Sequence, residues 1–73
     1  MGRLRKLSGR EICKILARNG FVEVRQKGSH VIMQLPTENS TVTVPVPLHS
    51  EVKIGTFLSI IRQSGIARSE FES

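Results

Sequence analysis

The sequence contains no aspartate, tryptophan or tyrosine, and it has only one cysteine and three phenylalanines among its 73 residues. Without aspartate, no Ser-His-Asp catalytic triad can be assembled. A single cysteine can form neither an internal disulfide nor a cysteine-rich metal site. The two histidines and the scattered glutamates lack the short spacing of metal ligands, so we expect no metal ion and no other cofactor.

Long apolar runs and glycine-rich phosphate loops are also missing. No stretch approaches the roughly 20 apolar residues of a membrane span. The start of the chain, MGRLRKLSG, is charged and has no apolar stretch behind it, unlike a signal peptide. We therefore expect a cytoplasmic protein that does not contact a membrane. The lone Cys13 falls among apolar helix positions and is expected to pack rather than react.

Positive charge is abundant but unevenly distributed. Lys and Arg number 11 against 6 acidic residues, which gives a net charge of +5. Residues 1–30 hold eight of the basic groups and two glutamates, whereas residues 31–73 hold three basic groups and four glutamates. A one-sided positive field attracts polyanions, of which nucleic acid is the commonest.

Two helices are predicted near the ends of the chain. The capping box Ser8-Gly9-Arg10-Glu11 precedes apolar residues at helical spacing, and Asn19-Gly20 ends that helix. Arg10, Lys14 and Arg18 stand four residues apart and should line one exposed face, as an RNA track or as a solvated surface. The second helix is expected within residues 51–64 and ends at Gly65; its predicted buried stripe is Ile54, Phe57, Leu58 and Ile61.

Three strands are predicted between the helices. Residues 21–26 and 29–35 are both rich in β-branched side chains, which favour strands. Lys27-Gly28 lies between them and predicts a tight hairpin turn. Residues 41–46 form the third strand. The sequence thus predicts a single α+β domain over residues 1–73, a two-layer α-β-β-β-α arrangement in which two helices cover one face of an antiparallel sheet. Residues 1–7 are expected to be flexible, and residues 69–71 to add a short helical turn. The same element order occurs in the fold that binds double-stranded RNA.

His30 is the strongest candidate for chemistry. It opens the second predicted strand directly after Gly28-Ser29 and close to Arg25 and Lys27. A histidine beside a glycine turn and among cations lies where a phosphate can approach, and histidine transfers protons near neutral pH. A surface histidine with no chemical role is the alternative interpretation. Nothing in the sequence fixes a role for His49.

Several motifs in one order resemble the HicA family. They are Ser8–Glu11, Gly20-Phe21, RQKGSH at 25–30, Val44-Pro45, His49, KIGT at 53–56 and IRQSGI at 61–66. This HicA/YcfA-like family comprises the mRNA interferase toxins of type II toxin–antitoxin systems. The resemblance covers nearly the whole chain, and RQKGSH is its most specific part. The segment VPVPLH departs from the more usual single proline before that histidine.

The resemblance implies an activity and two partners. The activity is an endoribonuclease that cleaves mRNA and thereby inhibits translation and growth; the partners are mRNA and a HicB-like antitoxin. The family's catalytic histidine follows Gly-Ser and carries over to His30. With His30 transferring the proton, Arg25 and Lys27 would offset the negative charge that develops on the phosphate, Gly28 would let the backbone approach it, and the Ser29 amide or hydroxyl would donate to it. RNA supplies its own 2′-hydroxyl nucleophile, so no metal is needed.

Two other functions remain open at this point. A non-enzymatic RNA-binding module of the same fold would show similar composition and charge. A DNA-binding or purely protein-binding module is disfavoured, because the whole sheet separates the two helices and leaves no helix-turn-helix pattern.

Overall fold

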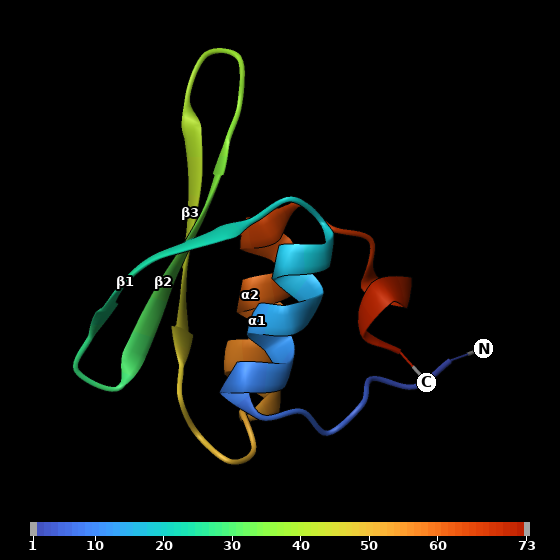
Figure 1. The fold of residues 1–73 in the computed structure, drawn as a ribbon. Coiled ribbons are helices and arrows are strands. Elements are labelled where there is room, and N and C mark those ends of the chain that lie inside the picture. Colours follow the sequence, from blue (N-terminus) through green and yellow to red (C-terminus); the bar gives the residue numbers. More distant parts are fainter. Residues whose placement is uncertain (1, 73) are drawn as a thin grey trace.

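The structure, a computed structural model, describes residues 2–72 and has the predicted order of elements (Figure 1). The three strands form one antiparallel sheet in the order β1-β2-β3. The bounds are α1 Gly9–Arg18, β1 Val22–Lys27, β2 His30–Pro36, β3 Thr41–Pro47, α2 Ile54–Ser64, and a short 3-10 helix η1 at Arg68–Phe71. The predicted α+β class is confirmed, and each strand lies within one residue of its predicted position.

Helix α1 begins with the capping box expected from the sequence. The Ser8 amide donates to a carboxylate oxygen of Glu11 at 2.9 Å, and the Glu11 amide donates to the Ser8 hydroxyl oxygen at 3.1 Å. These bonds satisfy two of the amides that a helix start leaves unpaired. Asn19 caps the end of the helix and is followed by Gly20, whose φ of 96° is a left-handed conformation that glycine adopts at little cost.

A two-residue turn, Gly28-Ser29, joins β1 to β2. The turn predicted at Lys27-Gly28 is therefore one residue too early. Gly28 has a φ of 60°, and no non-glycine residue among residues 2–72 has a positive φ, so only the first central residue is left-handed, as in a type II′ hairpin. The Gln26 side-chain amide donates to the Gly28 carbonyl at 3.2 Å and supports the turn. His30 thus becomes the first residue of β2.

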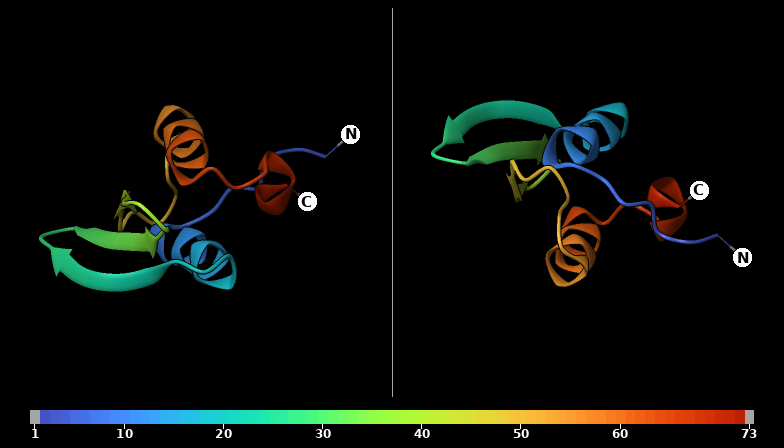
Figure 2. Two further views of the ribbon diagram at one scale, coloured as in Figure 1. Left: turned by 90° about the horizontal axis from the view of Figure 1, so that it is seen from above. Right: turned by 90° about the horizontal axis from the view of Figure 1, so that it is seen from below.

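One face of the sheet, the inner face, packs against the helices. Helix α1 contacts all three strands, whereas α2 packs along β3 at the opposite edge from β1 (Figure 2). Phe57 and Phe71 meet edge to face with their ring centroids 5.6 Å apart. The core contains apolar side chains from every layer: Leu7, Ile12, Cys13, Ile15, Leu16, Phe21, Val31, Met33, Val44, Val46, Val52, Phe57, Ile60 and Phe71. The other face, called the outer face below, is largely free of this packing.

The buried stripe of α2 differs from the prediction. Ile54 and Leu58 are 59% and 40% exposed, while Phe57, Ile60 and Ser64 are buried. The predicted stripe is therefore wrong at two positions. Burial of Ser64 costs little, because its hydroxyl donates to the Ile61 carbonyl at 2.9 Å. As a result, the side of α2 that carries Thr56, Ser59 and Gln63 faces β3.

The segment before α1 packs against the end of the chain. Leu4 forms a β-bridge with Glu72, and the Arg5 amide donates to the Phe71 carbonyl at 3.0 Å. Leu7 is only 1% exposed, and its carbonyl accepts from the Val52 amide at 2.9 Å. These contacts attach residues 4–7 to the domain, where the sequence suggested a loose end; Met1 lies outside the described residues. Within those residues, no helix has the length and apolar character needed to cross a membrane.

Candidate active site

His30 belongs to the outer face and is the first residue of the central strand β2, at the end where the β1–β2 hairpin turns. It is exposed and pairs directly with Lys27 of β1 on one side and with Pro47 of β3 on the other. Directly opposed residues of antiparallel strands project to the same face. The side chains of Lys27 and His30 are therefore neighbours on the outer face.

A β-bulge in β1 adds Arg25 to this group. The register shifts between Glu23 and Arg25, so Glu23 pairs with Met33 on the inner face while Arg25 pairs with Ile32 on the outer face. A regular strand would have placed the two side chains on one face, because residues two apart project alike. The bulge therefore separates the glutamate from the two cations. Glu23 instead forms an ion pair with Arg10 on α1, with 3.4 Å between the guanidinium nitrogen and the carboxylate oxygen.

The turn residues Gly28 and Ser29 border His30 through the backbone. Nothing lies within 4 Å of the point where a Cβ on Gly28 would stand, so the turn is open to an approaching molecule. The Ser29 carbonyl accepts from the Leu48 amide at 2.7 Å and links the turn to the loop after β3. The glycine is required by its positive φ, and its open surroundings also suit a close approach of phosphate.

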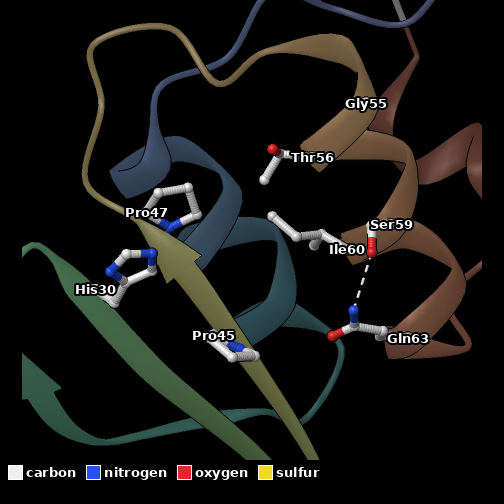
Figure 3. Close-up of a pocket in the computed structure, with 8 residues that line it drawn as sticks. All are labelled: His30, Pro45, Pro47, Gly55, Thr56, Ser59, Ile60 and Gln63. Carbon is white, nitrogen blue, oxygen red and sulfur yellow. Dashed lines mark hydrogen bonds between the residues drawn. The ribbon is translucent and has the colours of Figure 1, made fainter.

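A pocket of about 330 Å³ lies beside His30, between the outer face at the β3 edge and α2 (Figure 3). Figure 3 shows the imidazole on one side of it and the α2 side chains on the other. The lining residues are His30, Pro45, Pro47, Gly55, Thr56, Ser59, Ile60 and Gln63. The sequence analysis assigned no role to Pro45, Pro47 or the α2 residues, because which face of α2 meets β3 depends on tertiary packing.

The three cations of α1 lie elsewhere. Arg10, Lys14 and Arg18 are all exposed, as the sequence predicts, but none of them lines the pocket beside His30. Lys14 and Arg18 border a separate groove with Arg5. The structure thus brings Arg25, Lys27, Gly28 and Ser29 together with His30 and leaves the α1 cations apart from them.

The remaining chemically interesting residues do not approach this site. His49 is exposed in the loop before α2 and does not line the pocket; its backbone carbonyl accepts from the Gly9 amide at 2.9 Å. Cys13 is buried in the core at 7% exposure, and this burial raises the pKa of its thiol. Within residues 2–72, no three His, Cys, Asp or Glu side chains converge in a way that could hold a metal ion.

Fold and site together define a small basic α+β domain that presents a histidine, two cations and a pocket on one exposed sheet face. Residues 9–66 match the family model described as the HicA toxin of bacterial toxin–antitoxin systems. This match runs from the first residue of α1 to beyond the end of α2, so the chain belongs to the HicA toxin family. It is a toxin of a toxin–antitoxin system, and membership implies a cognate antitoxin. A comparison with curated protein sequences found no match.

Proposed function

We propose that this toxin is a metal-independent endoribonuclease that cleaves mRNA in the cytoplasm, with His30 as its catalytic residue. The observation that carries the proposal is the exposed position of His30 on the outer face, between Lys27 and a pocket of about 330 Å³. Family membership supports the same activity, since it makes the chain a toxin.

The chemistry uses the nucleophile that RNA itself carries. His30 accepts the proton of the 2′-hydroxyl, whose oxygen attacks the adjacent phosphorus. The P–O5′ bond breaks, and the leaving 5′-oxygen takes a proton from solvent water, while protonated His30 returns its proton to solvent. The products are a 2′,3′-cyclic phosphate and a 5′-hydroxyl end. Because the strand supplies the attacking oxygen, the step needs no water activated by a metal ion. A positioned histidine contributes about 10²- to 10⁴-fold to such a proton transfer.

The cations beside His30 offset the negative charge that develops on the phosphate. Lys27 lies directly across the ladder from His30, and Arg25 lies one row further along the same face. Charges fixed in advance at the reacting group stabilise the transition state without reorganisation. The Gly28-Ser29 turn adds open backbone next to the phosphate, with the Ser29 amide or hydroxyl as donor. Arg10, Lys14 and Arg18 would hold RNA further from the scissile bond.

The test is cleavage of 5′-labelled RNA by purified protein in the presence of a chelator. We expect cut RNA ending in cyclic phosphate, and a loss of about 10²- to 10⁴-fold in rate for His30→Ala. His49→Ala is the matched control, because His49 is exposed and lies outside the pocket. Expression in cells should arrest growth with the parent and with His49→Ala, but not with His30→Ala.

Two outcomes would contradict the proposal. Equal cleavage and toxicity by His30→Ala would show that another residue acts. Intact RNA that is bound with a steep salt dependence would identify a non-enzymatic RNA-binding module, because that dependence reports phosphate contacts.

We further propose that the antitoxin is HicB-like and covers this site with an acidic surface. Arg25 and Lys27 stand on an exposed face with no ion pair to an acidic residue among residues 2–72, which leaves their charge available to a partner. Charge complementarity mainly sets the association rate. Lys27→Glu should therefore slow association with the antitoxin encoded beside the toxin, whereas Arg68→Glu, at the far end of the chain, should not.

A further inference from the structure

The pocket beside His30 has the size and lining of a site for one nucleoside. Its volume of about 330 Å³ is at the lower end of the range of about 300–1,000 Å³ for small-molecule sites, too small for a duplex. Pro45 and Pro47 form an apolar side, and Ile60 closes the bottom. The three phenylalanines are at most 2% exposed, so no phenylalanine ring offers a stacking platform on this face. Pro45 is exposed whereas Pro47 is buried, so the ring of Pro45 is the apolar surface against which a base can lie.

The opposite side of the pocket carries an amide that one hydrogen bond orients. The Gln63 side-chain nitrogen donates to the Ser59 hydroxyl oxygen at 2.9 Å, one helical turn earlier on α2 (Figure 3). A primary amide has two N–H donors and one carbonyl acceptor. One N–H is used by Ser59, so Gln63 presents a single N–H beside a single acceptor oxygen. Every RNA base shows a donor next to an acceptor on its Watson–Crick edge, and single-stranded RNA is recognised at these edges. Guanine carries this pair in the opposite order from adenine and cytosine, so an amide held in one orientation distinguishes between them.

We propose that this pocket binds the base of one unpaired nucleotide next to the scissile phosphate, and that Gln63 selects that base while Ser59 positions the Gln63 amide. The proposal rests on the ribonuclease function, because it makes the pocket the specificity site of that same reaction. The sheet side and the α2 side of the pocket then have different roles. His30, on the sheet side, contacts the sugar and phosphate, and Gln63, on α2, contacts the base.

The first experiment maps cleavage sites on a randomised single-stranded RNA. Gln63→Glu replaces the donor–acceptor pair by two acceptors, so it should shift the preferred base toward guanine, whose Watson–Crick edge offers two adjacent donors. The expected change in the ratio between bases is about tenfold or more. Ser59→Ala should loosen the preference without favouring a new base. Gln34→Ala, a glutamine on the same sheet face outside the pocket, is the matched control.

Base preference is the informative readout, since a purely structural role of Gln63 would change the rate and leave the ratio between bases untouched. An unchanged cleavage pattern in Gln63→Glu and Ser59→Ala, with rates retained, would overturn the pocket assignment and leave the ribonuclease function standing.

The second experiment separates failure of the pocket from failure of the ribonuclease proposal. The four ribonucleoside 3′-monophosphates are added to the His30→Ala variant, and NMR shifts of the Gln63 side-chain amide and the Thr56 backbone amide are followed. We expect these signals to move with at least one nucleotide and to stay fixed with ribose 5-phosphate, which lacks a base. Shifts confined to residues outside the pocket, or none, would overturn the assignment even if the protein cuts RNA. Shifts in the pocket of the variant, together with no RNA cleavage by the parent protein, would keep the base site and refute the nuclease.

Discussion

The backbone of Gly9, the first residue of α1, lies directly against the carbonyl group of Pro47 at the end of β3. A Cβ built on Gly9 would overlap that carbonyl oxygen. The Gly9 amide also donates to the His49 carbonyl at 2.9 Å, and the Leu48 amide donates to the Ser29 carbonyl at 2.7 Å. The loop after β3 is therefore held by α1 on one side and by the β1–β2 turn on the other.

Gly9→Ala should lower the free energy of unfolding by about 1–3 kcal/mol, the usual cost of forcing extra atoms into a packed contact. Here the obstacle is backbone, which yields less readily than a flexible side chain. Gly55→Ala is the matched control, since nothing lies within 4 Å of its added Cβ. That helical substitution should be neutral or stabilise the protein by up to about 1 kcal/mol. Urea unfolding measures both, and equal stability of the two variants would refute the close approach.

Lys27→Ala and Lys14→Ala should have different kinetic effects although each removes one positive charge. Lys27 lies opposite His30, so its loss should lower kcat by about 10- to 100-fold. Lys14 is on α1 and does not line the His30 pocket, so its loss should raise KM with kcat nearly unchanged. Each variant should reduce the salt slope of RNA binding by about one. An equal fall in kcat for both variants would mean that Lys27 only attracts RNA electrostatically and does not stabilise charge at the scissile phosphate.

Local sequence signals account for most of the fold. The capping box at Ser8, the glycine at position 20 and the β-branched strands each act over a few residues, and the structure contains all of them. The start of α2 was less clear, because its N-cap, Lys53, makes no side-chain capping bond that a motif could reveal. The turn also lies one residue later than predicted, with the positive-φ Gly28 as its first residue.

The site was predictable only where it lies along one stretch of chain. His30, Lys27 and Gly28 are neighbours in sequence, so their proximity follows from a hairpin. The bulge that turns Arg25 away from Glu23 has no glycine or proline to signal it. The presence of Gln63 in the same pocket as His30 depends on how α2 is rotated against β3, which is set by long-range packing of Ile60 and Ser64.

The capping box should make stability depend on pH through Glu11. The hydrogen bond from the Ser8 backbone amide holds the pKa of the Glu11 carboxyl below its ordinary value of 4.5. The folded state therefore favours the ionised form, so this contribution is fully present above pH 4.5 and is lost as the pH falls through the lowered pKa. Glu11→Gln should lose stability relative to the parent at pH 7, and the difference should shrink below pH 4.5. Thermal unfolding across this range measures it, and a difference that does not change with pH would contradict the mechanism.

The buried thiol of Cys13 should react slowly with thiol reagents. Only the thiolate is nucleophilic, and burial raises the pKa of Cys13 and leaves the residue only 7% exposed. At pH 8 the folded protein should react at least about tenfold more slowly than the same chain in urea. A double variant, Cys13→Ala with Ala17→Cys, moves the single thiol to an exposed position one turn along α1 and should react rapidly while folded. If the native thiol reacted as fast as that exposed one, the contact between α1 and β1 would have to open readily. The inner face of the sheet would then be less firmly packed than the burial of Met33 and Phe21 indicates.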